Sequence, residues 1–319
     1  MHYVILDTET AGLYTVNGDK PPQTLRNCYV DNSKDEKGSL QSGDGCMGNT
    51  SCSQSIQALV GEAYYGLECL YEGKIPQGSI LTGFTDLDVL IGGLHSGDLI
   101  VVGARPCMGK TALAVKMICN IEFRNHDKPH VAIFSLEMSA KQWVTRMLFT
   151  EAKVTMNKLN TGKFTSTDWK NFSRASKLIA EANVQIYGNS YTNINRIIDQ
   201  CQILNEGSGL DLVVIDNGAM MLEEVSAALK ALAEELSLPI VVYSQLSRCL
   251  EDRQDKMPIL SDIPFFPTLE KYADVVMFLY RHEVYSQKPC HTGVVQMIIA
   301  KNRNGAVGTV PLTFDDGYL

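Results

Sequence analysis

The sequence predicts an α/β protein with a mostly parallel, twisted sheet that is covered by helices on both faces. Short apolar runs alternate with segments of helical periodicity along most of the chain, with short loops between them. The runs are apolar at nearly every position, which is typical of strands buried on both faces. One run, residues 99–102, leads into a glycine-rich loop and then into a helical pattern at 112–123, the strand, loop and helix order of a phosphate-binding loop.

The other elements follow from the same two periodicities. Apolar runs predict strands at residues 3–6, 130–136, 212–216, 239–245, 275–280, 294–300 and 307–314. Helical spacing predicts helices at residues 143–151, 168–182, 194–204 and 223–236. Residues 301–305 are expected to form a basic turn before the last strand.

Three segments are expected in the 319 residues, of which 45% are hydrophobic. Residues 1–55 form an atypical, largely flexible N-terminal segment, because 27–55 has too little apolar periodicity to bury a face. Residues 56–79 form a linker helix and a connection, and residues 80–319 form the α/β domain. The helix predicted at 55–72 either docks on a neighbouring subunit or packs on its own core, and the sequence leaves both open.

The glycine-rich loop has the spacing of a nucleotide site, except that its first glycine is Ala104, with Gly103 one place earlier. Backbone N–H groups of such a loop and the positive end of the next helix form an anion site. Gly109 permits a tight turn, Lys110 would reach the β- and γ-phosphates, and the Thr111 hydroxyl would complete a Mg²⁺ site. The predicted nucleotide-binding residues of the loop are Ala104, Arg105, Pro106, Cys107, Met108, Gly109, Lys110 and Thr111.

Polar side chains close three of the predicted strands. Glu137 is placed either to orient or deprotonate an attacking water, or to favour the start of the helix that begins after Ser139. Asp216 fits the second carboxylate that holds Mg²⁺ directly or through water, and so is predicted to bind nucleotide and metal. With Gln245, these residues fall at the carboxyl ends of parallel strands, where ligands bind in such sheets.

Composition limits the class of protein further. The net charge is -8, so any contact with nucleic acid has to be local. Nine scattered cysteines without a C-x-x-C pair indicate reduced thiols in a cytoplasmic protein. The first residues lack the basic region of a signal peptide, and no apolar run reaches the ~20 residues of a membrane span.

Several motifs in order carry a family resemblance. They are Thr82-Gly-Phe-Thr-Asp-Leu-Asp88, Gly92-Gly-Leu-His-Ser-Gly-Asp-Leu99, the phosphate loop, Phe134-Ser-Leu-Glu-Met138, Ser244-Gln-Leu-Ser-Arg248 and Lys301-Asn-Arg-Asn-Gly305. Together they resemble the RecA-type motor domain of DnaB-like replicative DNA helicases from about residue 80 to 314. The resemblance implies a RecA-like P-loop NTPase core and ATP-driven movement on single-stranded DNA.

The resemblance also implies residue roles and partners. Glu137 would be the catalytic base, Gln245 the sensor of the γ-phosphate, and Lys301 and Arg303 the residues inserted into a neighbouring subunit's site. Lys110 and Thr111 would bind nucleotide and Mg²⁺, with Asp216 beside the metal. ATP and Mg²⁺ are thus the implied cofactors, and the implied partners are single-stranded DNA, further copies in a hexameric ring, and primase or a helicase loader.

Two loops depart from the family pattern. Residues 217–222 pass directly into the helix at 223, where the family has a longer loop facing the central channel. Pro264-Phe-Phe-Pro267 stands where the family has an arginine loop that follows DNA phosphates. Phe265 and Phe266 either stack on bases or pack inward. The alternative function is therefore a degenerate nucleotide-binding ring subunit that does not unwind DNA.

Overall fold

The computed structural model describes residues 3–6, 13–16, 56, 60–61, 64, 79–124, 128–188, 193–216, 223–264, 271–285 and 293–313. The chain divides into two compact units, Met1–Pro76 and Gln77–Leu319. In the first unit, β1 (Tyr3–Leu6) pairs antiparallel with β2 (Leu13–Val16), so the strand predicted at 3–6 is confirmed. Residues 56, 60, 61 and 64 are helical, within the helix predicted at 55–72, and the segment 27–55 lies outside the described residues.

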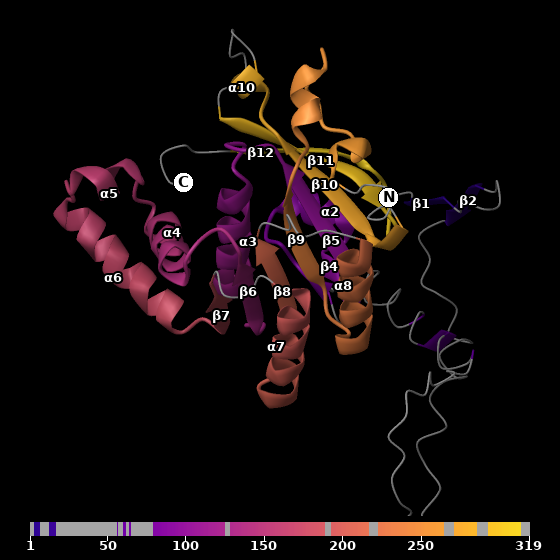
Figure 1. Ribbon diagram of the computed structural model, residues 1–319, viewed down its shortest axis with the longest axis horizontal. Coiled ribbons are helices and arrows are strands. Elements are labelled where there is room, and N and C mark those ends of the chain that lie inside the picture. Colours follow the sequence, from indigo (N-terminus) through magenta and orange to yellow (C-terminus); the bar gives the residue numbers. More distant parts are fainter. Residues whose placement is uncertain are drawn as a thin grey trace, which may run out of the picture. The chain divides into compact units, whose positions relative to one another are not determined.

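The second unit is built on an eight-stranded sheet with the order β12-β11-β10-β5-β9-β8-β6-β7 (Figure 1). Its strands are β5 (Leu99–Ala104), β6 (Val131–Ser135), β7 (Val184–Tyr187), β8 (Leu212–Asp216), β9 (Ile240–Gln245), β10 (Val275–Tyr280), β11 (Val294–Asn302) and β12 (Gly308–Thr313). The six strands from β10 to β7 are parallel, and β11 and β12 are added antiparallel at one edge. The predicted mostly parallel sheet is confirmed.

The helices of this unit are α2 (Thr85–Ile91), α3 (Lys110–Arg124), α4 (Ala140–Ala152), α5 (Asn157–Thr161), α6 (Ser166–Ala180), α7 (Ile194–Gly207), α8 (Glu223–Leu236) and α10 (His282–Tyr285). A short β3 (Ser79–Ile80) pairs with β4 (Leu94–His95). Every helix predicted after residue 80 is present. The sequence did not predict β2, β3, β4, β7, α2, α5 or α10, because each is too short to show a clear period.

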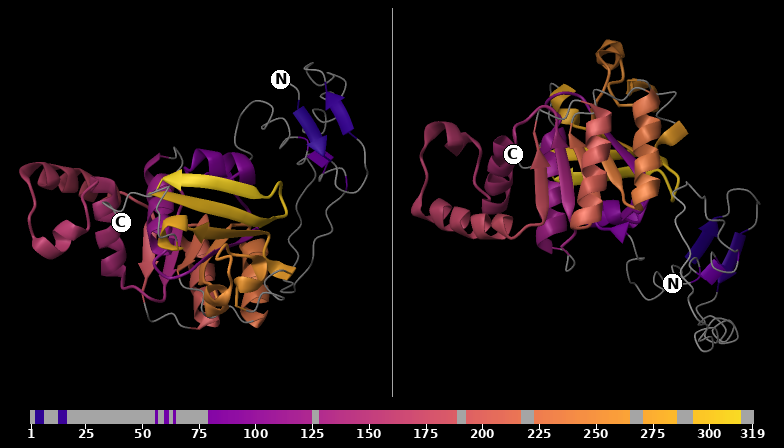
Figure 2. Two further views of the ribbon diagram at one scale, coloured as in Figure 1. Left: turned by 90° about the horizontal axis from the view of Figure 1, so that it is seen from above. Right: turned by 60° about the horizontal axis from the view of Figure 1, so that its bottom comes forward.

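Alternate residues of the central strands enter two different cores. Ile100 and Val102 of β5 belong to a cluster with residues of α2, α3 and α4. Leu99 and Val101 belong to a second cluster with residues of α7 and α8. Successive strand side chains point to opposite faces, so these two clusters lie on the two faces of the sheet (Figure 2). The prediction of helices on both faces is confirmed.

The register brings the carboxyl ends of four parallel strands together. We call this end of the sheet its carboxyl edge, and the end where these strands begin its amino edge. Ala104 pairs with Gln245, Ser135 with Asp216, and Asp216 with Tyr243. The loops that follow β5, β6, β8 and β9 therefore leave the sheet side by side. Among the described residues, no helix is long and apolar enough to cross a membrane.

Candidate active site

The glycine-rich loop bridges the end of β5 and the start of α3. Cys107 and Gly109 have positive φ angles of 64° and 96°, which curl the backbone, and the Leu113 N–H donates to the Gly109 carbonyl at 2.9 Å as α3 begins. Next to the loop lies a hollow of about 480 Å³. The hollow is lined by Ala104, Arg105, Pro106, Cys107, Gly109, Lys110, Thr111, Ala112, Glu137, Arg146, Gln245 and Arg281.

Two of the predicted nucleotide-binding residues lie just behind this hollow. The Met108 side chain is 2% exposed and packs in the core cluster of α3, so only its backbone is available to a ligand. Asp216 is fully buried, and the Lys110 Nζ lies 3.9 Å from its Oδ1. The lysine thus stands between the buried carboxylate and the hollow.

Gly103 provides the space beneath the loop. A Cβ atom at this position would lie 2.7 Å from Leu246 Cδ2 and 2.9 Å from Phe278 Cδ1, closer than packed carbon atoms approach. Gly103 is therefore required by packing inside β5. Ala104, which replaces the usual loop glycine, is the last residue of the strand and is 1% exposed.

Glu137 lies between the end of β6 and the start of α4. The helix has a capping box in which the Ser139 hydroxyl accepts from the Gln142 N–H, and the Gln142 Oε1 accepts from the Ser139 N–H. The helix start is thus satisfied by Ser139 and Gln142. Glu137 itself lines the hollow beside the phosphate loop.

The residues around the hollow fit a nucleotide with a hard cation. No group of three or more His, Cys, Asp or Glu side chains converges on one point in the described parts of the chain. A magnesium ion bound with few protein ligands takes its remaining oxygens from phosphate and water. Thr111, which lines the hollow, and Asp216, which lies behind Lys110, would provide such a donor set, and Lys110 would be available to a phosphate.

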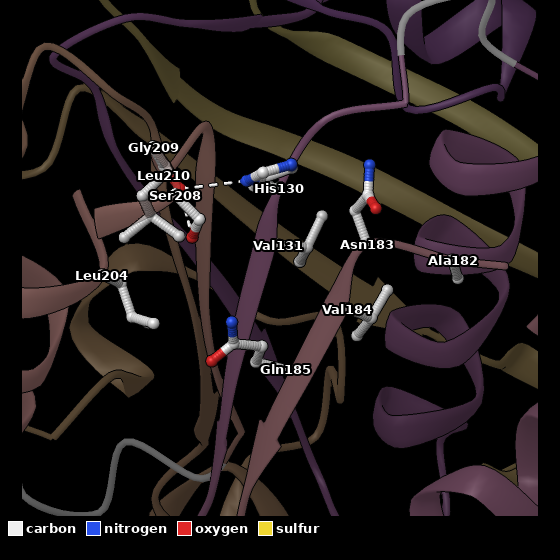
Figure 3. A pocket seen from close by; sticks show the side chains of 10 residues that line it. All are labelled: His130, Val131, Ala182, Asn183, Val184, Gln185, Leu204, Ser208, Gly209 and Leu210. Carbon is white, nitrogen blue, oxygen red and sulfur yellow. Dashed lines mark hydrogen bonds between the residues drawn. The ribbon is translucent and has the colours of Figure 1, made fainter. Parts of the chain in front are cut away.

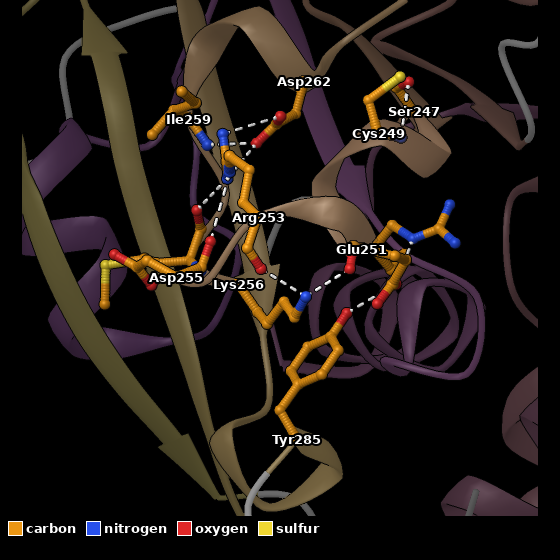
Figure 4. A network of polar contacts seen from close by, with 11 residues as sticks. Ser247, Cys249, Glu251, Arg253, Asp255, Lys256, Ile259, Asp262 and Tyr285 are labelled. Carbon is orange, nitrogen blue, oxygen red and sulfur yellow. Dashed lines mark hydrogen bonds and ion pairs between the residues drawn. The ribbon is translucent and has the colours of Figure 1, made fainter.

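Arg105 anchors the loop to the segment that follows β9. Its Nε donates to Glu251 Oε1 at 2.8 Å, and its Nη1 donates to the Leu246 carbonyl at 2.9 Å. The Tyr285 hydroxyl donates to the same Glu251 oxygen at 2.9 Å (Figure 4). The hydrogen bond from Arg105 holds the pKa of Glu251 below its usual range, whereas burial and then Glu251 raise the pKa of Tyr285 to about 12.

The same segment is held together by a second carboxylate. Arg253 makes a two-pronged contact with Asp262, with Nη1 and Nη2 donating to its two oxygens at 3.1 and 2.9 Å (Figure 4). The Ile259 N–H also donates to Asp262 Oδ2 at 2.8 Å. The polypeptide between Gln245 and residue 264 is thus fixed as a compact loop beside the hollow.

Two arginines in the hollow were not predicted from the sequence. Arg146 comes from α4, and Arg281 directly follows β10, the parallel neighbour of β5. Arg281 Nε donates to Glu283 Oε1 at 2.9 Å. The hydrogen bond from this arginine is the main reason why the pKa of Glu283 lies below its usual range. The signal for Arg281 was its place at the end of a predicted strand, whereas Arg146 sits inside a helical pattern that gives no such sign.

Lys301 and Arg303 lie at the amino edge of the sheet, where the parallel strands begin. Lys301 Nζ donates to the Ala273 carbonyl at 2.6 Å. Arg303 Nη1 contacts Asp274 Oδ1 at 3.1 Å, and its Nη2 donates to the Lys271 carbonyl. Because β11 runs antiparallel to β10, these residues are level with the start of β5, not with its phosphate loop. The expected turn at 301–305 begins later, since β11 continues to Asn302.

A second hollow of about 250 Å³ lies where β6 and β7 begin, beside the end of α7 (Figure 3). It is lined by His130, Val131, Ala182, Asn183, Val184, Gln185, Leu204, Ser208, Gly209 and Leu210. None of the predicted site residues is among them. The two altered loops, residues 217–222 and Phe265 with Phe266, fall outside the described residues.

The fold and the hollow define the class of the protein: a RecA-like P-loop NTPase domain, with its phosphate loop at the carboxyl edge of a mostly parallel sheet. Residues 79–319 match the family described as DnaB-like helicase C terminal domain. The chain belongs to this family, as the motifs at residues 82–305 predicted.

Similar proteins agree with this assignment. The chain is 39% identical over 280 residues to the replicative DNA helicase DnaB of Geobacillus stearothermophilus, covering 83% of this chain and 61% of that protein. It is 38% identical over 283 residues to the replicative DNA helicase DnaC of Bacillus subtilis, covering 85% and 62%. The chain therefore spans about three fifths of the length of these relatives.

Solved structures give the same result for the fold. One solved ATPase domain superposes with a TM-score of 0.74 at 32% identity, covering 83% of this chain and 97% of that chain. A DnaB-like replicative helicase, described together with its interactions with primase, gives the same TM-score and identity over 66% of its own length.

Proposed function

We propose that this protein is an ATP-dependent DNA helicase of the replicative type, acting as a ring in which ATP hydrolysis drives movement along single-stranded DNA. One observation carries the proposal: the sheet register gathers the phosphate loop, Glu137, Asp216 and Gln245 at one edge. The names of the relatives support the same activity. We include a cytoplasmic location in the proposal, since the scattered cysteines without a C-x-x-C pair indicate reduced thiols.

In this proposal the residues in and behind the hollow have separate roles in phosphoryl transfer. The curled loop and Lys110 bind the β- and γ-phosphates, and Thr111 with Asp216 hold Mg²⁺. Bound Mg²⁺ neutralises charge that develops on the phosphate oxygens. Glu137 orients and deprotonates the attacking water, and Gln245 contacts the γ-phosphate from the neighbouring strand. Arg146 and Arg281 add positive charge to the same wall.

Lys301 and Arg303 are proposed to act on the hollow of a neighbouring subunit. The rise of the four residues from Ile100 to Ala104 separates their level from the phosphate loop by about 13 Å. They cannot reach the loop of their own chain while the sheet is intact. A cation supplied in trans to a phosphoryl-transfer site is worth ~10³–10⁵ in rate, which couples hydrolysis to assembly.

The proposed partners are single-stranded DNA, five further copies in a hexameric ring, and primase or a loader. One solved relative is described with its interactions with primase. The alternative of a degenerate ring subunit rests on the two loops that depart from the family sequence. The names of the relatives do not favour it, and measurements of hydrolysis and unwinding separate the two functions.

We would measure steady-state ATP hydrolysis with and without a single-stranded oligonucleotide, and then strand separation on a forked duplex. The expected result is hydrolysis stimulated by the oligonucleotide, together with unwinding, and neither activity in Lys110→Ala. Lys128→Ala is the matched control, since Lys128 is an exposed lysine far from the loop. Hydrolysis without unwinding or stimulation would contradict the helicase and leave the degenerate subunit.

A further inference from the structure

The three helices α4, α5 and α6 form a helical arm, residues 140–180, whose charge is opposite to that of the rest of the chain. The arm contains eight lysines and arginines and only two acids, a net charge of +6. The remaining chain has 20 basic and 34 acidic residues, a net charge of -14. A local concentration of positive charge on an acidic protein is the electrostatic sign of a site for a polyanion.

The helical arm is a fixed element with a core of its own. It stands out from the β7 side of the sheet in every view (Figures 1 and 2). Phe149, Ala152, Val154 and Ala175 are buried in it, and Phe164 and Phe172 pack against them. The start of α6 is closed by a capping box between Thr165 and Asp168. A surface on this arm is therefore preorganised, which reduces the entropy lost on binding.

One side of α6 carries a row of exposed cations. Lys170, Arg174 and Lys177 are spaced i, i+4 and i+7, so they lie along one side of the helix over about 10 Å. All three are exposed, and none forms an ion pair with any described residue. Two acids flank the row: Asp168, two residues before Lys170, is engaged by Lys158 Nζ at 2.7 Å, and Glu181, four residues after Lys177, forms no ion pair among the described residues. The positive charge of the row is thus not neutralised within the described part of the chain.

An exposed aromatic side chain, Trp169, directly precedes Lys170 of this row. Trp169 is 62% exposed, although tryptophan is normally among the more buried side chains. Its ring makes edge-to-face contacts with Phe164 and Phe172, at centroid distances of 5.6 and 6.0 Å. These contacts hold the indole in place while most of its surface stays open to solvent.

We propose that the exposed side of α6 binds single-stranded nucleic acid, with Lys170, Arg174 and Lys177 on the phosphates and Trp169 stacked on an unpaired base. Basic side chains with an aromatic platform are the recurring features of such sites. A duplex offers no free base face for Trp169, and the carboxylates of an acidic peptide are repelled by the negative face of the indole ring. This site lies outside the nucleotide hollow, in which Arg146 is the arm's only cation, and goes beyond the proposed function.

The protein carries its own reporter for this site. Its only two tryptophans are Trp169 and Trp143, and Trp143 is fully buried. We would titrate the full chain with a single-stranded oligonucleotide and follow tryptophan emission and its quenching by acrylamide. Binding should quench Trp169 and protect it from acrylamide, and Trp169→Phe should abolish both changes. An unchanged Trp169 signal at saturating oligonucleotide would overturn the proposal.

Two matched double variants test the cations. Lys170→Ala/Arg174→Ala removes two charges from the row, whereas Lys128→Ala/Arg196→Ala removes one exposed lysine and one exposed arginine elsewhere. Only the first should weaken binding, and it should lower the slope of log K against log salt by about 1.4, from ~0.7 per phosphate contact. Trp169→Ala should weaken binding roughly five-fold or more at any salt concentration. Equal effects of the two doubles would contradict a site on α6.

Competitors and a nucleotide-site variant distinguish single-stranded nucleic acid from other ligands of the same surface. The measurements are repeated in Lys110→Ala, where binding at α6 should persist even if the proposed nucleotide site fails. Polyglutamate and duplex DNA should compete more weakly than the single strand. Polyglutamate that protects Trp169 better than the oligonucleotide would assign the surface to an acidic protein. Protection that follows protein concentration alone would assign it to a second copy, and either result overturns the proposal.

Discussion

The two edges of the central sheet hold their charged residues in opposite ways. At the carboxyl edge, Lys110, Glu137, Arg146 and Arg281 surround a hollow of about 480 Å³. At the amino edge, Asp274 is 4% exposed. Its carboxylate accepts three hydrogen bonds, from the Leu99 N–H and Lys230 Nζ at 2.8 Å each and from Arg303 Nη1 at 3.1 Å.

The difference shows which charges have a structural task within one chain. Asp274 and its partners satisfy one another, so this cluster joins β5, α8 and the turn after β11 without a ligand. The cations around the hollow converge on a space large enough for a ligand. By its contacts Arg303 belongs to the Asp274 cluster, and by its proposed role it acts on the nucleotide hollow of a neighbouring subunit. The largest effect on ATP hydrolysis is therefore expected when Arg303 is replaced.

Arg303→Ala should lower ATP hydrolysis by ~10³–10⁵ while leaving nucleotide affinity unchanged, because the cation is supplied in trans. Mixing Arg303→Ala with Lys110→Ala protein should restore part of the activity, since some mixed interfaces combine an intact loop with an intact arginine. Arg196→Ala, which removes an exposed arginine of α7, is the control. If mixing restores nothing, Arg303 belongs only to the structural cluster at the amino edge.

Glu137→Gln should slow hydrolysis by ~10²–10⁴ and keep ATP binding, as expected for loss of a general base. Single-turnover hydrolysis and equilibrium binding of ATP distinguish the two effects. Glu181→Gln, an exposed change at the end of α6, should alter neither. A normal single-turnover rate would reduce Glu137 to a helix-terminal carboxylate.

Asp274→Ala should destabilise the domain by about 3 kcal/mol, because it leaves buried donors without their acceptor. Denaturant unfolding measures this effect, and Asp252→Ala, an exposed change, is the control. Nucleotide affinity of the folded variant should stay the same, since the hollow lies at the other edge. A loss of affinity at full folding would show that the two edges are coupled.

Gly103→Ala should cost ~1–3 kcal/mol of stability, because the new Cβ overlaps Leu246 and Phe278 under the phosphate loop. Gly207→Ala at the end of α7 is a matched control, since nothing lies within 4 Å of its added Cβ. Thermal unfolding compares them. Equal melting temperatures of the two variants would mean that Leu246 and Phe278 move to accommodate the added Cβ without loss of stability.

Glu251→Gln should have the smallest effect, ~0.2–1 kcal/mol, because its side chain is 39% exposed. Since Arg105 lowers the pKa of Glu251, the stabilisation is present above about pH 4.5 and is lost as the pH falls through the lowered pKa. Melting temperatures of the two proteins should therefore differ at pH 7 and converge near pH 3. A constant difference would place the effect elsewhere.

Much of the site could be predicted because its chemistry is local. The strand, loop and helix at 99–123 predict a phosphate site from consecutive residues, and Asp216 and Gln245 each end a strand that its apolar run reveals. Arg146 and Arg281 could not be found in this way. They reach the hollow from a helix and a strand that are distant from the loop in sequence, and only packing brings them together.

The sequence alone determined the α/β fold, the phosphate loop and the family, because strand periodicity and loop spacing are written in consecutive residues. Tertiary structure alone decided the strand order, the pairing of Ala104 with Gln245, and the position of Arg303 at the edge opposite to the loop. Those relations depend on long-range register between strands. Register is set by the packing of whole faces, which no single motif encodes.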